Sequence, residues 1–475
     1  MLFNSFQFVI FFTILVVLFY AIPFKWKWLL LLIASCYFYI AYIPVYILIL
    51  AFTITVDYFV GVFLEKATAR SRKPLLIISI IANIGLLFFF KYYAFFTENI
   101  SFVLSHMGYR TKISPFNLIL PIGLSFHTFQ SLSYIIEVYR GNQKAEKHFG
   151  IYALYVMFFP QLVAGPIERP QNMLHQFYED RKFNPDDITA GLTQMLRGFF
   201  KKLVVADRLA IYVNAVYNRP ASHNGISLIT ATIFFAFQIY CDFSGYSDIA
   251  IGAARILGYK LVTNFNNPYL ARNINEFWKR WHISLTTWFR DYLYIPLGGN
   301  RVQPMHLYFN LLLVFTISGL WHGASWNFIL WGLLNGLYLV FLRITWKFWP
   351  RFYTLTGLDK LDWLKIPLQM TITTVFVSLS WVFFRANNIH DAAIIFKQMS
   401  SFKGHLFTGG YTFHYCLIAI LILLLYEIKA EYFEGSYIRF KNTNYLFRSC
   451  YYALVVVTIA MLGVFDGGQF IYFQF

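Results

Sequence analysis

The chain has 475 residues, of which 58% are apolar, 21% are aromatic and only 13% are charged. Soluble domains are usually about 45–50% apolar and about 25% charged, so this composition excludes an ordinary soluble protein. The formal net charge is +17. Because the cations lie between apolar runs, we assign them to cytoplasmic loops that contact membrane lipid, and not to a nucleic-acid interface.

The apolar runs have the lengths of membrane-crossing helices, about 17–25 residues. Short alternating strands typical of a membrane barrel are absent from the sequence. The four cysteines, Cys36, Cys241, Cys416 and Cys450, have no CxxC spacing, so neither a disulfide framework nor a metal site is predicted. Residues 1–22 lack a basic region and a small-residue cleavage site, so we expect them to stay as the first span.

Five spans are predicted before residue 140: residues 6–22, two spans within 28–64, residues 74–96 and residues 115–139. The loop 65–73 carries four cations. It should be cytoplasmic, which places the N-terminus and the loop 97–114 outside. The fifth span contains His127 and Gln130. Its polar groups must find partners inside the protein, so it should face a bundle or a cavity.

The middle of the chain mixes apolar and charged residues. Residues 149–165 are long enough to span, but cations on both sides predict a re-entrant segment. Residues 191–217 suit a helix lying in the interface. Residues 226–258 carry Asp242 and Asp248 in an apolar setting around Gly245. Each carboxylate either caps a broken helix or pairs with a cation, or else lines a substrate path.

Residues 264–301 are too charged to span. On one helix, the apolar side chains Trp278, Trp281, Leu285 and Trp288 would share a face opposite cations, which is typical of an interfacial helix.

Five further spans follow at residues 306–321, 325–344, 366–384, 415–427 and 447–464. The total is about eleven crossings, with an extracytoplasmic C-terminus. No internal repeat or flexible linker is evident, so we predict one integral domain: N-terminal helices (1–110), a catalytic core (115–390), and C-terminal helices with a tail (391–475).

Two histidines are the candidate catalytic residues. His322 ends an apolar run in the stretch SGLWHGASWNF, and an ionisable side chain at such a depth is a functional hypothesis by default. Histidine suits proton transfer near neutral pH. Attack of a hydroxyl on a thioester needs a base and oxyanion donors but no metal. His282 lies among cations that would hold a cofactor's phosphates. The candidate tunnel or cofactor-lining residues are Lys279, Arg280, Arg290, Asn327, Asp242 and Asp248.

Other interpretations of these residues stay open. Either histidine is alternatively a hydrogen-bonded core residue. Haem ligation would need histidines on facing helices at matched depth, and His282 lies in a cationic segment. A secondary transporter would also carry broken helices and buried polar residues, although we find no inverted repeat.

Several blocks in a fixed order resemble the membrane-bound O-acyltransferase family, in particular the membrane subunit of bacterial alginate O-acetyltransferase and its peptidoglycan O-acetyltransferase relatives. The similarity covers nearly the whole chain. The blocks are LPIGLSFHTFQSLSYIIEVYRG (120–141), FFPQLVAGPIERP (158–170), YCDFSGYSDIAIG (240–252), FWKRWHISLTTWFRDYLYIPLGGNR (277–301), GLWHGASWNF (319–328), WVFFRA (381–386) and YFQF (472–475).

The resemblance implies an all-α polytopic fold, with a ring of about eleven transmembrane helices plus re-entrant and interfacial helices around a tunnel. It implies that His322 is the catalytic histidine and His282 the second invariant polar position. Acetyl would come from cytosolic acetyl-CoA and cross the bacterial inner membrane. An extracytoplasmic SGNH-type protein would then place it on a cell-surface glycan. His127 departs from the pattern of the alginate relatives, where an aromatic residue is expected.

The C-terminal YFQF block adds a hypothesis. Related systems use a terminal tyrosine as an acyl relay, and Tyr472 fits that position. A phenol has a pKa of about 10 and its ester stays reactive. The alternative is an aromatic anchor at the membrane surface.

For the whole chain, the alternatives are D-alanyl transfer to teichoic acid from a carrier-protein thioester, or a non-enzymatic transporter or export component.

Overall fold

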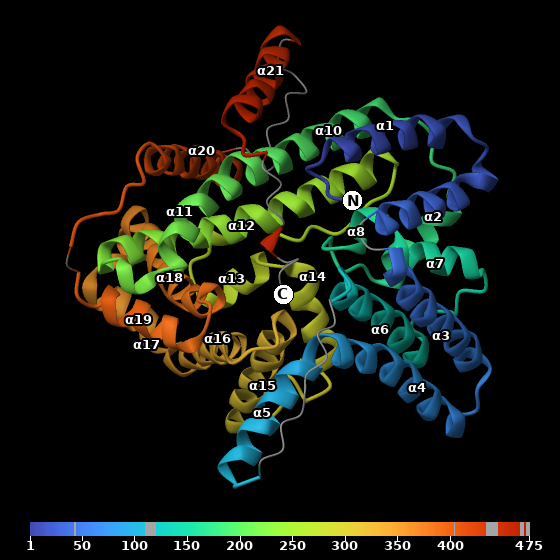
Figure 1. The fold of residues 1–475 in the computed structure, drawn as a ribbon, viewed down its shortest axis with the longest axis horizontal. Helices are drawn as coiled ribbons and strands as arrows, with labels where there is room; N and C mark the ends of the chain where they lie inside the picture. Colours follow the sequence, from blue (N-terminus) through green and yellow to red (C-terminus); the bar gives the residue numbers. More distant parts are fainter. Residues whose placement is uncertain (42–43, 110–119, 403, 434–444, 466–469, 472–475) are drawn as a thin grey trace. The chain divides into compact units, whose positions relative to one another are not determined.

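The computed structural model describes residues 1–41, 44–109, 120–402, 404–433, 445–465 and 470–471. These residues form helices joined by turns and loops (Figure 1), and no strand occurs among them. They make two compact units, residues 1–195 with 247–262 and residues 196–246 with 263–475. The boundary falls inside helix α12 (Gly225–Ile256), and the single membrane domain stays a prediction.

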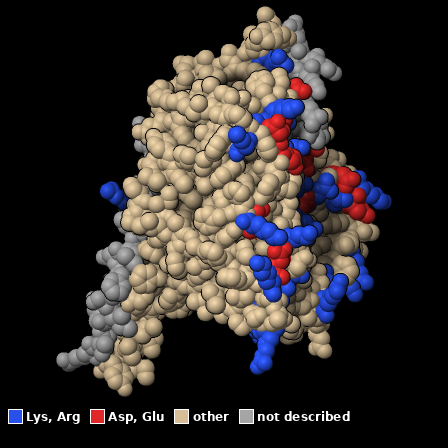
Figure 2. Space-filling model, turned by 90° about the vertical axis from the view of Figure 1, so that its right-hand side faces the viewer, with Lys and Arg blue, Asp and Glu red and all other residues tan. Residues whose placement is uncertain are grey.

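Seven helices of the described residues are long and apolar enough to cross a membrane. The visible face in Figure 2 agrees with this, because most of it carries neither sign of charge while the charged side chains gather in one part. The all-α, multi-pass prediction is confirmed. The expected count of eleven crossings is not.

The first unit begins with α1 (Phe6–Ala21) and α2 (Phe24–Ile40). It continues with α3 (Ile47–Lys66), α4 (Ala69–Leu87) and α6 (Leu124–Arg140), which pack on one another. The carboxylate of Asp57 on α3 accepts hydrogen bonds from Ser79 and Asn83 on α4. α4 continues through a short π-helix (Phe88–Tyr92) into α5 (Tyr93–His106). The loop expected from residue 97 is therefore helical as far as residue 106.

The predicted break in the block FFPQLVAGP is present. α7 (Phe149–Met157) ends before Phe158, and the short α8 (Phe159–Leu162) starts with Pro160 in its first turn. Proline lacks an N–H, so the first turn of a helix accommodates it best. The re-entrant path of this segment stays a prediction.

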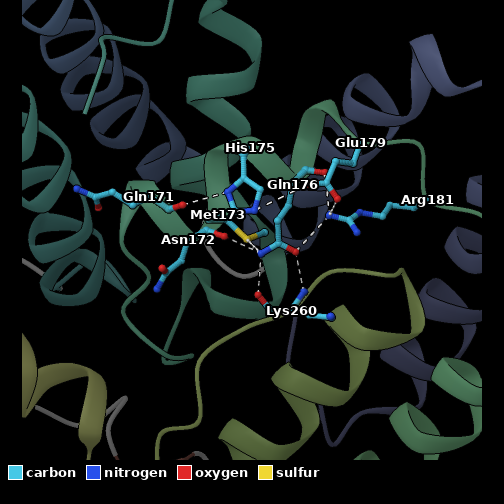
Figure 3. Close-up of polar contacts among 8 residues, drawn as sticks. All are labelled: Gln171, Asn172, Met173, His175, Gln176, Glu179, Arg181 and Lys260. Atoms are coloured by element: carbon cyan, nitrogen blue, oxygen red, sulfur yellow. Dashed lines mark hydrogen bonds and ion pairs between the residues drawn. The ribbon is translucent and has the colours of Figure 1, made fainter. Parts of the chain in front are cut away.

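Within the first unit, the segment that follows α12 is held by an amide pair (Figure 3). The Gln176 side chain donates to the Lys260 carbonyl at 2.9 Å and accepts from the Lys260 N–H at 2.9 Å. Arg181, which also contacts Gln176, forms an ion pair with Glu179 at 2.8 Å. These contacts hold residues 258–262 against the segment around α9 (Pro170–Met173).

Helix α12 is continuous through Gly245, so neither Asp242 nor Asp248 caps a broken helix, which was one of the roles considered for them. A Cβ on Gly245 would lie 2.8 Å from the carbonyl oxygen of Gly198, on α10 (Pro185–Phe199). In the first unit a Cβ on Gly252 would lie 2.6 Å from the carbonyl oxygen of Gly191. The glycines therefore allow close backbone packing of α10 and α12 and do not break the helix. α10 continues through a short π-helix (Phe200–Ala206) into α11 (Asp207–Tyr217).

The described residues of the second unit continue with nine α-helices between residues 274 and 462. They are α13 (Ile274–Arg280), α14 (Ile283–Phe289), α15 (Pro304–His322), α16 (Trp326–Thr345), α17 (Phe348–Thr356), α18 (Asp362–Arg385), α19 (Ile389–Met399), α20 (Thr412–Tyr432) and α21 (Tyr445–Leu462). α15 and α16 cross where Gly319 meets Gly332. Side chains at this crossing would separate the two backbones, so the glycines bring the end of α15 close to α16.

Candidate active site

His282 lies at a sharp bend between α13 and α14. Its backbone has φ +43°, a left-handed conformation that is uncommon for a residue other than glycine. The expected single helix over this region is therefore two short helices. The aromatic face predicted for it is not exposed either, since Trp278, Trp281, Leu285 and Trp288 are all buried. They form core packing of the second unit, which corrects the prediction of an interfacial helix.

The bend is held by Asn264. Its side-chain oxygen accepts hydrogen bonds from the Ser284 N–H at 3.2 Å and the Ser284 hydroxyl at 2.9 Å, and it lies 3.2 Å from Nδ1 of His282. Because the backbone N–H can only donate, the shared Asn264 atom must be an oxygen. Nδ1 of His282 therefore carries the proton in this contact, and in the neutral ring Nε2 is the basic nitrogen.

His282 is 1% exposed and contacts Phe243 edge-to-face, with ring centroids 4.7 Å apart. Burial lowers the pKa of His282 from 6.5 to about 3, because removal from water disfavours the charged imidazolium. The ring is therefore neutral throughout the physiological range of pH.

His322 is the last residue of α15 and is 5% exposed. Its ring meets Trp331 of α16 at a centroid distance of 5.0 Å and Phe384 of α18 at 5.5 Å. The next residue has to be a glycine, since the Phe328 ring fills the space that a Cβ on Gly323 would take. Aromatic rings from α16 and α18 therefore surround the imidazole of His322.

Both histidines line one cavity of about 740 Å³, a volume in the usual range for small-molecule sites. Trp321 contacts both rings, at 6.3 Å from His282 and 4.9 Å from His322. Other lining residues include the cations Lys279, Arg290 and Arg343, the hydroxyl residues Thr286, Thr287, Tyr294 and Ser318, and Trp278. The cavity therefore combines two imidazoles, three cations and an aromatic wall.

Residues 148–386 match the model of the membrane-bound O-acyltransferase family. The chain is 34% identical to a peptidoglycan O-acetyltransferase of Helicobacter pylori, over 94% of this chain and 91% of that protein. It is 33% identical to a probable alginate O-acetylase AlgI of Pseudomonas putida, over 99% of both. It is 30% identical to a teichoic acid D-alanyltransferase of Bacillus subtilis, over 58% and 71%.

The chain belongs to the membrane-bound O-acyltransferase family. It is therefore a multi-pass membrane acyltransferase, as the sequence blocks predicted.

The structure brings only some of the predicted site residues of this acyltransferase to the cavity. His282, His322, Lys279 and Arg290 line it. Arg280 instead forms ion pairs with Glu276 at 2.8 Å and Glu431 at 2.9 Å. Their roles stay predictions.

The remaining predicted site residues have other partners. The Asn327 side chain donates to the Ala386 carbonyl at 2.8 Å. Asp242 pairs with Lys202, in line with the interpretation that it meets a nearby cation. Asp248, in the first unit, accepts from Gln194 at 3.2 Å. Tyr472 lies outside the described residues.

The residues of the site that were not predicted from the sequence include Asn264, Arg343 and Trp278 in its role as a polar group. Arg343 is a cation near the end of an apolar run, and this position in the sequence could have identified it as a candidate. Trp278 was noted only as an apolar residue, yet its buried indole N–H has no hydrogen-bond partner among the described residues. Nothing in the sequence linked Asn264 to His282, because their contact depends on the folded bend.

Proposed function

We propose that this acyltransferase moves acetyl from cytosolic acetyl-CoA across the membrane for O-acetylation of a cell-surface polysaccharide. The observation that carries the proposal is that His282, His322 and three cations line the same cavity. The names of the relatives, a peptidoglycan O-acetyltransferase and probable alginate O-acetylases, support acetyl as the group and a polysaccharide as the final acceptor.

In the proposed reaction His322 is the general base. Its imidazole takes the proton of the acceptor hydroxyl as the oxygen attacks the thioester carbonyl. The C–O bond forms, the C–S bond breaks, and the thiolate leaving group receives the proton from the imidazolium. The indole N–H of Trp278 would donate to the developing oxyanion. His282, whose Nδ1 proton is held by Asn264, would orient the substrates by accepting a hydrogen bond at Nε2. Lys279, Arg290 and Arg343 would hold the phosphates of the donor.

Tyr472 is proposed as the acceptor hydroxyl that relays acetyl to an extracytoplasmic SGNH-type protein. The support is the position of the YFQF block at residues 472–475 and the reactivity of a phenyl ester. Mass spectrometry of the C-terminal peptide after exposure to acetyl-CoA tests this step. No acetyl on Tyr472, even without the partner protein, removes the relay and leaves an aromatic anchor.

A second candidate is D-alanyl transfer from a carrier-protein thioester, which the teichoic acid D-alanyltransferase of Bacillus subtilis favours. Purified protein with radiolabelled acetyl-CoA and no carrier separates the two. Turnover of acetyl-CoA that is lost in His322→Ala supports the proposal. Turnover only of a D-alanyl carrier thioester replaces it, and substrate flux through vesicles without acyl consumption would favour a transporter or export component.

A further inference from the structure

A buried lysine in the second unit holds two carboxylates. Lys202, in the short π-helix between α10 and α11, is 1% exposed. Its Nζ lies 2.7 Å from Oδ1 of Asp207 and 2.6 Å from Oδ1 of Asp242. Buried charges are stable only when they are paired and hydrogen-bonded, so these three residues, here called the triad, must keep their contacts together.

The triad also binds the chain's own C-terminal tail. The backbone N–H of Ile471 donates to Oδ2 of Asp242 at 2.7 Å. The Phe470 ring lies over Lys202, with Nζ 4.4 Å from the ring centroid, and meets Tyr246 edge-to-face at 4.6 Å. Chain ends are usually poorly ordered unless they are tied down, so this burial of Phe470 and Ile471 calls for a specific cause.

The two kinds of contact have different roles: the Asp242 hydrogen bond fixes the register of the tail, and the Phe470 ring adds affinity. A main-chain N–H is present at any residue except proline, so the Asp242 bond holds the backbone whatever the side chain is. The Phe470 ring, between a cation and a tyrosine edge, selects which residue enters. The bond is charge-assisted, and such bonds are short and strong. Together they hold the tail in one register.

We propose that the triad, with Tyr246, is a docking site for the C-terminal tail, and that Asp242 is a positioning residue that sets the register of the last residues through the N–H of Ile471. Because Tyr472 directly follows Ile471 in the sequence, a change in the register of Ile471 would also affect the acyl relay proposed for Tyr472. Only the consequence for acyl relay by Tyr472 rests on the proposed function. The docking does not.

Hydrogen–deuterium exchange of the C-terminal peptide in the full-length purified protein tests the docking. Asp242→Ala should raise the exchange rate of the Ile471 amide at least about tenfold. The matched control is Asp248→Ala, the other carboxylate of α12, which should leave the tail at the wild-type rate. Phe470→Ala leaves the triad intact and covers the case in which Asp242→Ala does not fold. Wild-type exchange in every folded variant, or equal acceleration in Asp248→Ala, overturns the proposal.

Transfer assays test the positioning role. Ile471→Pro removes the N–H, whereas Ile471→Ala keeps it, and both leave the triad unchanged. We expect Ile471→Pro to lower transfer to the downstream acceptor at least about tenfold with unchanged acetyl-CoA binding and thermal stability, and Ile471→Ala to stay near wild type. Equal activity in the two variants overturns the positioning role. If the wild-type protein does not use acetyl-CoA at all, the proposed function is refuted. The result of the hydrogen–deuterium exchange experiment is unaffected by that outcome.

Discussion

Buried histidines occur in both units, and their surroundings differ. In the first unit His127 is 1% exposed and its Nε2 lies 2.8 Å from the Thr53 hydroxyl, inside the packing of α3 and α6. In the second unit His282 and His322 are equally well buried, yet both line a cavity with cations. Burial alone therefore does not identify a candidate catalytic histidine. The feature that marks His282 and His322 as candidates is that both line one cavity together with cations.

The largest expected effect is at His322. We predict that His322→Ala keeps its fold and loses acyl transfer at least about 10²-fold, since removal of a general base usually costs that much. Turnover of labelled acetyl-CoA by purified protein measures this. Retained activity above about 10% would make His322 a structural residue and would end the contrast with His127.

The next effect tests how Asn264 positions His282. Asn264→Ala removes the acceptor of the Nδ1 proton and should lower activity roughly tenfold, since orienting a catalytic imidazole is part of general acid–base catalysis.

Asn264→Asp is the matched variant, because it keeps an acceptor oxygen and adds a negative charge, which raises the pKa of His282. In the wild type this pKa is about 3, so His282 adds no acidic limb between pH 5 and 8. In Asn264→Asp the proton is kept to higher pH, and activity should fall as pH drops below the new pKa. Identical pH–rate profiles would show that Asn264 does not act through His282.

A smaller effect is expected at Trp278. Trp278→Phe keeps an aromatic ring on the cavity wall and removes only the indole N–H. If that N–H donates to the reacting group, kcat should fall roughly two- to tenfold, the worth of one neutral hydrogen bond of about 0.5–1.5 kcal/mol. A rise in KM with unchanged kcat would indicate ground-state binding instead.

The smallest effect on activity is expected in the first unit. Thr53→Val removes the hydroxyl that contacts His127 and should lower the free energy of unfolding by about 1 kcal/mol, with turnover within about twofold of wild type. Thermal unfolding and acetyl-CoA turnover on the same sample measure both. A loss of turnover comparable to that of His322→Ala would show that His127 also takes part in the reaction.

Local predictions succeeded where the chemistry is local. The break before Pro160 and the helical runs of α15, α16 and α18 follow from properties that are present in short stretches of sequence. The prediction based on periodicity failed. The helix expected to present an aromatic face to the interface is bent at His282, and its aromatic side chains are buried. Hydrogen bonds from Ser284 to Asn264 hold this bend, and a helical period gives no sign of that contact.

The amino-acid sequence by itself determined the class of this protein: an all-α, multi-pass membrane acyltransferase, because apolar runs of crossing length and ordered motif blocks are written along the chain. It also singled out His282 and His322. Only the tertiary structure decided that these two share a cavity, that Asn264 selects the basic nitrogen of His282, and that Asp242 holds the tail. Each of these joins residues that are far apart in the chain, and such contacts exist only once packing has brought their helices together.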